Sequence, residues 1–571
     1  MALASRANLV ESHFAGNEEN GLSPYEAWIE ADAIAHPYVP VAPDRLVSIV
    51  MPTCNTPEQF LREVVDSVRT QSYPNWELRI ADDASSEPHV RRMLDAYAAE
   101  DARIHVIYRS ERGGISRATN AALAEVAGSI VTFLDHDDVL HADAIGEIAA
   151  RFATEDVDVV YTDHDALGED GRRRFPFFKP DFSPDLLLMQ MYIGHLVAFS
   201  REILSNVGGL RERFDGAQDY DLMLRCMAAG ARVGHVPKVL YHWRQHAGST
   251  SSNADSKPYA HVAGMQALQD YLDLHVPGAV VSDAGPVFCY DVRYPFAADV
   301  PKASIIIPTR DGVELLATCV RSIREKTDYA DYEILVVDNG SVMPETQEWF
   351  ARMTTEGAIR VIDAPVPFNW SHLNNLAAAQ CDGQVLVFLN NDTEVLDSEW
   401  LQRLCENALR PGVGVVGPLL LYPDGTIQHA GVVVGMGGWA DHVFKALEPA
   451  HLQVLYVSPV MRRNVLAVTG ACMAISRKTF ERIGGFDESF IVCGSDVELC
   501  LRAYRAGLSN VYLPEARLVH HESKTRDPRA IPENDFVLSA QAYSPWREDG
   551  DPYFSRNLDP MTPAPSFKVY P

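Results

Sequence analysis

Two segments of this sequence repeat each other in register, and the repetition limits the possible folds more than any other feature. Three pairs of positions carry it, each separated by 255 or 256 residues: Pro52 and Pro308, Asp82 and Asp338, Asp137 and Asp392. One such match could arise by chance. Three within one residue of the same interval indicate a duplicated domain.

Each copy alternates short apolar strands with amphipathic helices. After the first strand, apolar residues recur at helical spacing, as in the run 60–68 and again in 315–323. Further strands are expected at 104–108, 129–134, 359–362 and 384–389. The alternation predicts a mostly parallel sheet covered by helices on both faces. The expected fold class is therefore α/β, with two Rossmann-like domains in tandem.

The repeat also divides the chain. With 571 residues, the chain is too long for one domain and fits about two to four. We expect five parts: an N-terminal extension (1–44), a first domain (45–250), a linker (251–301), a second domain (302–525), and a C-terminal tail (526–571) that packs on the second domain.

Composition excludes several classes of protein. The chain has 49 Lys and Arg against 78 Asp and Glu, a formal charge of −29, so extended binding to nucleic acid is not expected. No run of 18 apolar residues occurs, and the N-terminus lacks the pattern of a secretory signal. The nine cysteines are scattered without a C-x-x-C pair, as in a reducing compartment. These features predict a soluble cytoplasmic protein.

An acidic cluster follows the fourth strand of each copy. It reads Asp135-His-Asp-Asp138 in the first copy and Asn390-Asn-Asp392 in the second. Neighbouring carboxylates repel one another unless a cation or hydrogen-bond donors offset them, and carboxylate oxygens suit Mg²⁺ or Mn²⁺. A solvated loop that caps a helix is the alternative for either copy alone. Because the cluster occurs twice, we favour metal binding, weaker in the second copy, which keeps one carboxylate.

These residues also carry a resemblance to a known family. Pro-Thr after the first strand, Asp after the second and D-x-D or N-N-D after the fourth resemble the nucleotide-sugar signature of GT-A domains in family 2 inverting glycosyltransferases. The resemblance covers about residues 45–250 and 302–525. It implies that strand-end residues hold the nucleotide: Pro52, Thr53, Asp82, Asp83, Pro308, Thr309 and Asp338. It implies metal ligands at Asp135, Asp137, Asn390 and Asp392.

The family also places a general base on a later helix. Gly216-Ala-Gln-Asp219 and Gly494-Ser-Asp496 both fit, and each follows a Gly-Gly lead-in, so the resemblance implies that Asp219 and Asp496 are the bases. A carboxylate that stabilises a helix N-terminus is the alternative. About 22 extra residues separate metal and base in the second copy, expected near 422–454, where the loop 435–438 could shape acceptor binding.

A histidine follows each base at a spacing of 23 or 24 residues. In related enzymes a histidine here completes the metal site, and imidazole suits Mn²⁺. We assign His242 and His520 as ligands. The neighbouring His246 and His521 stay open as alternatives, as does a buried structural role for any of the four.

Two further segments extend the resemblance. Residues 112–120 resemble the donor-binding segment of the family, and residues 368–375 occupy that place in the second copy, in a form similar to rhamnosyltransferase-like members. Donor contacts are expected at Arg112, Arg117, Asn120 and Asn374. Residues 550–558 resemble a C-terminal segment of polysaccharide-assembling relatives.

The resemblance as a whole implies a bifunctional, metal-dependent inverting glycosyltransferase. Its donors would be UDP- or dTDP-linked sugars, with dTDP-rhamnose in one domain. Its acceptor would be a growing glycan linked to undecaprenyl diphosphate, as in bacterial O-antigen assembly. Peripheral membrane contact would run through the basic segment Arg172–Arg174, for which a solvated loop is the alternative. The oligomeric state stays open.

Rival functions remain at this point. One domain, the second because of Asn390, could be inactive and bind or dock a glycan. A nucleotidyltransferase would need a Gly-rich, Lys-bearing phosphate loop after the first strand, and the sequence has none there. The segment Gly412–Gly417 matches the dinucleotide fingerprint, but Pro418 and apolar residues follow it instead of a helix, so a dehydrogenase is rejected.

Overall fold

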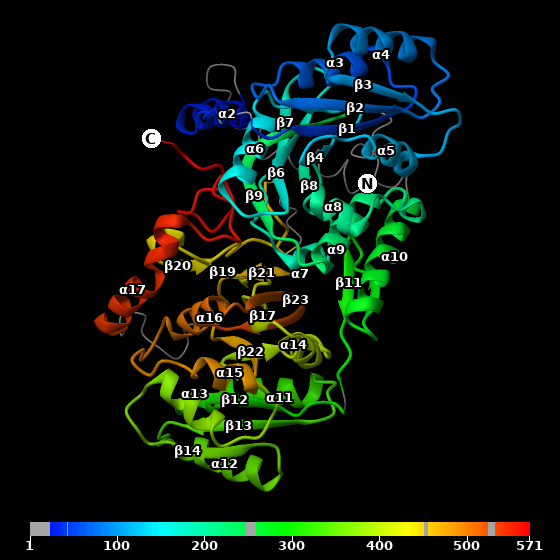
Figure 1. Cartoon of the computed structure of the whole chain (residues 1–571). Helices are drawn as coiled ribbons and strands as arrows, with labels where there is room; N and C mark the ends of the chain where they lie inside the picture. Colours follow the sequence, from blue (N-terminus) through cyan, green and yellow to red (C-terminus); the bar gives the residue numbers. More distant parts are fainter. Residues whose placement is uncertain are drawn as a thin grey trace.

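The computed structural model describes residues 23–40, 42, 44–246, 258–297, 299–449, 455–522 and 531–570. Two α/β domains lie one above the other in Figure 1, and the C-terminal part of the chain runs along the side where they meet. Each domain is built on one large mixed sheet flanked by helices.

The sheet of the first domain has the order β3-β2-β1-β4-β8-β6-β9-β5, and β7 adds to β6. Its strands are β1 (Val47–Thr53), β2 (Trp76–Asp82), β3 (Ile104–Tyr108), β4 (Ile130–Phe133), β5 (Val139–Leu140), β6 (Val159–Leu167), β7 (Arg173–Phe177), β8 (Val197–Ser200) and β9 (Val233–Arg244). Its helices are α3 (Glu58–Arg69), α4 (Pro88–Glu100), α5 (Ile115–Leu123), α6 (Ala144–Thr154), α7 (Pro184–Leu187), α8 (Arg201–Val207), η1 (Glu212–Phe214) and α9 (Gln218–Ala228).

The sheet of the second domain has the order β14-β13-β12-β15-β22-β17-β23-β16, with β18 on β17 and β21 on β23. Its strands are β12 (Ala303–Thr309), β13 (Tyr332–Asp338), β14 (Arg360–Asp363), β15 (Val385–Leu389), β16 (Thr393–Val395), β17 (Val413–Leu421), β18 (Ile427–His429), β21 (Arg463–Val465), β22 (Cys472–Ser476) and β23 (Ser509–His520). A separate hairpin consists of β19 (Val432–Val434) and β20 (Ala440–His442), joined through η3 (Met436–Gly438). The helices are α11 (Val313–Lys326), α12 (Pro344–Thr355), α13 (Trp370–Ala378), α14 (Trp400–Ala408), α15 (Arg477–Ile483) and α16 (Ser495–Arg505).

The two sheets match strand for strand. Their first four strands occupy equal places, and β8, β6, β9 and β5 correspond to β22, β17, β23 and β16. In both, the first two strands pair in parallel, so Thr53 lies opposite Asp82 and Thr309 opposite Asp338. The expected fold class, two α/β domains of GT-A type in tandem, is confirmed. The strand-end residues of the repeat therefore lie at the carboxyl edge of each sheet, where ligands bind in folds of this kind.

The segment expected to be a linker contains folded elements. Helix α10 (Pro258–His275) packs against α9, and β10 (Val280–Asp283) and β11 (Tyr290–Arg293) form a hairpin. Arg293 in that hairpin pairs with Glu399 and Glu406 of the second domain. This segment thus packs on both domains. The predicted boundary between residues 250 and 251 lies outside the described residues.

The tail, which was expected to pack on the second domain, contacts both domains. Helix α17 (Glu533–Asp549) packs against α16. Further on, Asn557 donates hydrogen bonds from Nδ2 to Asp163 Oδ2 (2.9 Å) and to the Pro237 carbonyl (3.0 Å) in the first domain. Phe567 stacks on Tyr25 of the N-terminal helix α2 (Pro24–Ala35), with ring centroids 5.7 Å apart.

A buried polar network joins the two domains directly. Asp185 in α7 is 2% exposed, and its carboxylate lies 2.5 Å from Arg410 Nη1 and accepts a hydrogen bond from Asn464 Nδ2 at 2.8 Å. Asn464 in turn accepts a hydrogen bond from the backbone N–H of Asp185. Although burial alone would raise the pKa of Asp185, the Arg410 charge holds that pKa below its usual value.

The predicted membrane-contact segment is neutralised by carboxylates. Arg172 pairs with Glu26, Arg173 with Asp165 and Arg174 with Asp170, at 2.5–2.6 Å. Arg173 is largely buried, and its carboxylate partner Asp165 is fully buried. Within the described residues, no helix is both long enough and apolar enough to cross a bilayer.

The domain junction gives a first prediction. Replacing Asp185 by Ala leaves Arg410 buried without its partner, which we expect to lower the free energy of unfolding by about 3–5 kcal/mol. The control is Asp170→Ala, which breaks the exposed pair with Arg174 and should leave stability almost unchanged, because water screens this pair. Urea unfolding measures both. Equal effects from the two variants would contradict a stabilising role for the buried network.

Candidate active site

Residues at or next to β1, α5, β4, β8 and α9 enclose a small pocket of about 40 Å³ at the carboxyl edge of the first sheet. Pro52 lies at the end of β1, Asp135 follows β4, His195 precedes β8, and Asp219 lies in the first turn of α9. The other walls are mainly apolar: Ile115, Thr119, Phe133, Leu134, Val197, Phe199, Leu210, Gln218 and Leu222. Three residues that the sequence predicted separately, Pro52, Asp135 and Asp219, thus come together.

The strand-end aspartates are held by local turns. Asp82 accepts hydrogen bonds from Ser85 Oγ (2.5 Å) and from the Ser85 backbone N–H (3.3 Å). In the second domain Asp338 accepts one from the Ser341 backbone N–H (2.9 Å). The Pro-Thr residues remain beside them, and Thr309 Oγ1 accepts a hydrogen bond from Asn391 of the N-N-D motif at 2.9 Å.

Asp83 has a different position from Asp82. It is buried, pairs with Arg109, and accepts hydrogen bonds from the backbone N–H groups of Gly113 (3.0 Å) and Gly114 (2.8 Å). Asp83 therefore holds the loop ahead of α5 against the sheet edge, and its carboxylate is occupied by that loop.

The predicted donor segment lies on α5 and the loop before it. Arg117 pairs with Glu212 at 2.8 Å, about half exposed. Burial raises the pKa of the Cys54 thiol, and the charge of Arg112 opposes this. Asn120 donates to the Leu210 carbonyl and accepts from the Leu210 N–H. Both polar groups of Asn120 thus brace the loop that leads to Asp219.

In the second domain, Asn375 makes the bonds that correspond to those of Asn120, with the backbone of Phe486. The predicted residue Asn374 corresponds instead to Thr119, which lines the first pocket. The Asn374 Nδ2 donates to the Trp370 carbonyl (2.8 Å), while the Asn374 Oδ1 is buried without a hydrogen-bond partner among the described residues.

The acidic cluster of the first domain divides into two exposed carboxylates and one buried one. Asp138 accepts hydrogen bonds from Tyr241 Oη (2.6 Å) and from the Arg244 backbone N–H (2.8 Å). Burial, together with the charges of Asp137 and Asp135, holds the pKa of Asp138 well above its usual range. Asp137 and Asp135, which are 23% and 41% exposed, keep their carboxylates toward the edge of the site.

The structure brings His246, and not the assigned His242, beside Asp137. His246 Nε2 lies 2.9 Å from Asp137 Oδ2, whereas His242 Nδ1 lies 2.6 Å from the buried Asp165. The register explains the difference. In the second domain His520 faces Thr393, the residue after Asp392, but His242 faces Val139, two residues after Asp137. Because side chains alternate along a strand, one residue of shift turns His242 to the other face.

His195 is a site residue that the sequence reasoning missed. Its Nε2 lies 3.4 Å from Asp135 Oδ2. Burial alone would lower the pKa of His195, but the negative charges of Asp135, Asp219 and Asp138 raise it to about 9. His195 thus contacts the predicted metal ligand and lines the same pocket as the predicted base. The one signal in the sequence was a histidine interrupting the apolar run 186–199.

The second domain replaces this charge pair by neutral residues. The antiparallel registers of β8 with β4 and of β22 with β15 match His195 to Ala471, and Asn390 stands where the first domain has Asp135. The Asn390 N–H donates to the Ala471 carbonyl at 2.9 Å. Beside them, Asp496 accepts hydrogen bonds from the N–H groups of Gly470 (2.7 Å) and Val497 (2.9 Å).

Both predicted bases have raised pKa values, and loss of solvent is the main cause in each case. For Asp219, burial raises the pKa and the His195 charge lowers it; for Asp496, burial raises it and the hydrogen bond from Gly470 lowers it. Each carboxyl is therefore a stronger base than an exposed aspartate. This is the property that a proton acceptor working near neutral pH requires.

Comparison with known proteins agrees with this arrangement. The family model described as glycosyl transferase family 2 matches residues 48–208 and again residues 304–484, which together make up more than half of the chain. The chain belongs to glycosyl transferase family 2. The two matches contain the strand-end residues of both copies and most strands of the two sheets, while β9 and β23 lie beyond them.

Family 2 relatives of known name extend the comparison. The chain is 42% identical over 560 residues to the O-antigen biosynthesis protein RfbC of Myxococcus xanthus, which covers 97% of this chain and 44% of that protein. It is 34% identical over 213 residues to the putative teichuronic acid biosynthesis glycosyltransferase TuaG of Bacillus subtilis, covering 36% of this chain and 82% of the relative.

A third relative, the uncharacterized protein y4gI of Sinorhizobium fredii, is 43% identical over 494 residues, which is 86% of this chain and 54% of that protein. The chain thus spans about half the length of the curated relatives that match most of it. A solved structure titled GalNAc-T7 with UDP, GalNAc and Mn²⁺ aligns with 42% of this chain and 47% of its own at 17% identity and a TM-score of 0.34.

The second family 2 domain offers a fitting set of donors for a divalent cation. Asp392 is 5% exposed, and its Oδ1 lies 3.3 Å from His520 Nε2 but accepts no hydrogen bond from the described residues. Among those residues no three His, Cys, Asp or Glu side chains form a ready-made metal cage. A cation that shares its coordination with phosphate oxygens and water does not need one.

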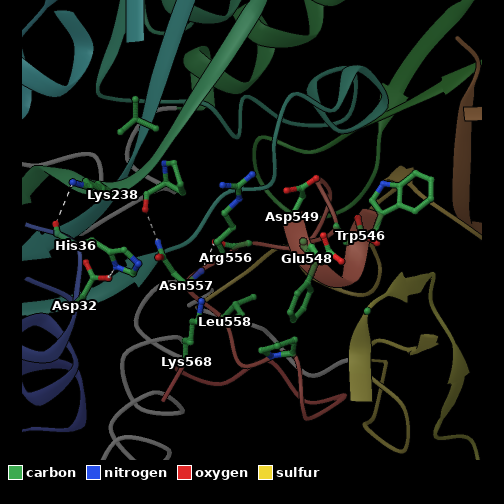
Figure 2. Close-up of a pocket in the computed structure, with 18 of the residues that line it drawn as sticks. Asp32, His36, Lys238, Trp546, Glu548, Asp549, Arg556, Asn557, Leu558 and Lys568 are labelled. Atoms are coloured by element: carbon green, nitrogen blue, oxygen red, sulfur yellow. Dashed lines mark hydrogen bonds and ion pairs between the residues drawn. The ribbon is translucent and has the colours of Figure 1, made fainter. Parts of the chain in front are cut away.

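A second, larger cavity lies apart from these residues. It has a volume of about 760 Å³ and lies between α2, α6, β9, the turn after β19 and the tail. Lys238, Arg556 and Lys568 line it together with Asp32 and Asp549 (Figure 2). None of the predicted site residues is among its lining residues. It belongs to the junction of the domains.

The histidine assignment yields a prediction for metal binding. In a chain whose second site is silenced by Asp392→Ala, we expect His246→Gln to weaken Mn²⁺ binding in the presence of UDP by about tenfold or more. The matched control His242→Gln keeps a donor for Asp165 and should leave the affinity unchanged. Calorimetric titration measures both. A loss confined to His242→Gln would restore the assignment made from the sequence.

Proposed function

We propose that the chain is a bifunctional inverting glycosyltransferase that adds sugars from nucleoside diphosphate donors to a growing bacterial surface polysaccharide. The observation that carries the proposal is the doubled pair of carboxylates. In each domain a strand-end acidic motif (Asp137 or Asp392) lies at the same sheet edge as a desolvated aspartate in the first turn of a helix (Asp219 or Asp496).

The proposed step follows from these positions. Asp219 or Asp496 accepts the proton of an acceptor hydroxyl while that oxygen bonds to the anomeric carbon of the donor sugar. The bond from the anomeric carbon to the diphosphate breaks on the opposite face, so the configuration inverts and a nucleoside diphosphate leaves. A divalent cation held by Asp137 or Asp392 would offset negative charge on that leaving group.

The substrates are proposed from the family and from the relatives. The likeness to an O-antigen biosynthesis protein supports a bacterial polysaccharide as product. We propose UDP- or dTDP-linked donors, with dTDP-rhamnose for one domain. As acceptor we propose a glycan linked to undecaprenyl diphosphate at the inner face of the cell membrane. Because Arg172–Arg174 are paired with carboxylates, membrane contact would need another surface or a partner.

A second candidate is one catalytic domain with an inactive partner. It is favoured by the neutral residues Asn390 and Ala471 in the second domain, where the first has Asp135 and His195. In that case the second domain would bind or dock a glycan. The two proposals differ in how many transfers the chain performs.

Single-site variants distinguish them. With a panel of UDP- and dTDP-sugars, we expect Asp137→Ala to abolish one nucleoside diphosphate-releasing activity and Asp392→Ala to abolish another, because each removes the carboxylate at one donor site. Chromatography of the products and of the released nucleotide measures this. If either variant keeps both transfers, the two-site proposal is wrong; release of pyrophosphate would indicate a nucleotidyltransferase.

The raised pKa values of Asp219 and Asp496 give a prediction for pH. Only the deprotonated carboxylate accepts a proton, so kcat/KM should fall as pH decreases through a pKa above that of an exposed aspartate. Initial rates in buffers of constant ionic strength measure this for each transfer, using the single-site variants to separate them. An acid limb at or below the ordinary aspartate pKa in both transfers would exclude these residues as the bases.

A further inference from the structure

Two exposed aromatic side chains lie side by side on the second domain, outside the pocket residues described above. The rings of Trp439 and Phe536 are 5.6 Å apart at 72° to each other, and the residues are 41% and 43% exposed. The Arg547 guanidinium lies 5.7 Å from the Trp439 ring. Single exposed aromatic residues are common, but two that touch form an apolar patch of the kind that marks binding surfaces.

Phe536 is fixed next to the base of the second domain. Its neighbour Asp535 is fully buried and accepts hydrogen bonds from the backbone N–H groups of residues 491, 492 and 493 at 2.7–3.0 Å. Those residues lead directly into Gly494, which begins α16, and Asp496 lies in the first turn of that helix. Gly494 has φ 89°, and a Cβ there would lie 2.5 Å from Ser539 Oγ of α17. Helix α17 is thus packed closely onto the turn that presents the base.

Trp439 approaches Phe536 from the side of the predicted metal site of the second domain. It lies between η3 and β20, in the insertion by which the second copy exceeds the first. Three residues later His442 contacts His429, with 2.8 Å between their Nδ1 atoms. Burial, and then the nearby His442, Arg463 and His520, hold the pKa of His429 well below its usual range. His429 faces Leu420 of β17, and Leu420 faces Leu518 of β23, two residues before His520. The insertion therefore passes near His520, the residue beside Asp392, before its tip meets Phe536.

We propose that Trp439 and Phe536 form a subsite that holds a sugar ring of the acceptor glycan in front of Asp496. The inference rests on the proposed function of the second domain. An aromatic face carries partial negative charge and stacks on the C–H face of a sugar ring, while Arg547 is available to its hydroxyl groups. In the first domain, the connection between β6 and β8 corresponds to this insertion. It carries β7, which packs against α2. The subsite therefore belongs to the second transfer alone.

The first arm of the test measures binding without catalysis. The protein is labelled with 5-fluorotryptophan, and Trp439→Phe identifies the ¹⁹F signal of Trp439 among those of the eight tryptophans. The probes are the methyl glycosides of glucose, galactose, rhamnose and N-acetylglucosamine. We expect at least one probe to shift the Trp439 signal saturably in the wild type and not in Phe536→Ala. No shift with any probe, or covering of the pair by another protein segment, overturns the proposal.

The second arm measures transfer. We expect Trp439→Leu and Phe536→Ala to raise the acceptor KM of the second transfer about tenfold, while donor hydrolysis without acceptor stays unchanged. Trp439→Phe, which keeps an aromatic face, should lose less than Trp439→Leu. Leu274→Ala, an exposed apolar residue of α10, is the matched control. Unchanged acceptor KM in both subsite variants overturns the proposal.

The two arms separate failure of the subsite from failure of the proposed function. If no nucleotide sugar is turned over but a glycoside shifts the Trp439 signal, the sugar subsite stands and the transferase assignment of this domain fails. If transfer proceeds and the variants behave as wild type, the transferase assignment stands and the subsite fails.

Discussion

Parallel pairing between the first two strands of each sheet is the constraint on which both sites depend. The ladder sets Thr53 against Asp82 and Thr309 against Asp338 without any side-chain contact between the two strands being needed. Since side chains alternate along a strand, a shift of one residue would turn each aspartate to the opposite face. The fourth strand then brings its acidic motif to the same edge, and the helix that carries Asp219 or Asp496 closes the site from the side.

The two copies have diverged in a correlated way around this constant frame. In the first copy the Asp135 carboxylate contacts the His195 imidazole. In the second copy Asn390 and Ala471 occupy these positions, so both charges are absent. Loss of one charge alone would leave the other near a desolvated base without compensation, which is unfavourable in a low-dielectric site. The joint replacement preserves local neutrality.

Much of the fold and part of the site could be predicted from the sequence. The repeat interval and the alternating apolar pattern predicted two α/β domains, because strands that alternate with helices favour a mostly parallel sheet. The order of the strands was not predicted, and the antiparallel strands β8 and β22 in each sheet were not expected. The pocket residues Pro52, Asp135 and Asp219 also followed, since each ends or begins a predictable element. The choice between His242 and His246 could not be made from the sequence, because it depends on register within a long strand, which spacing along the chain does not fix. His195 was missed because its role arises only from the antiparallel return of β8 beside β4.

The tail contributes something that neither domain could supply by itself. Asp535 holds the turn before the base of the second domain, whereas Asn557 and Phe567 are anchored on the first domain and the N-terminal helix. One stretch of about forty residues is therefore shared between two otherwise repeated units. If the gene were divided between the repeats, only one of the two products would retain the tail. The other product would then lack the contacts that the tail makes with it. The duplicated enzyme is thus constrained to be inherited and to diverge as a single chain.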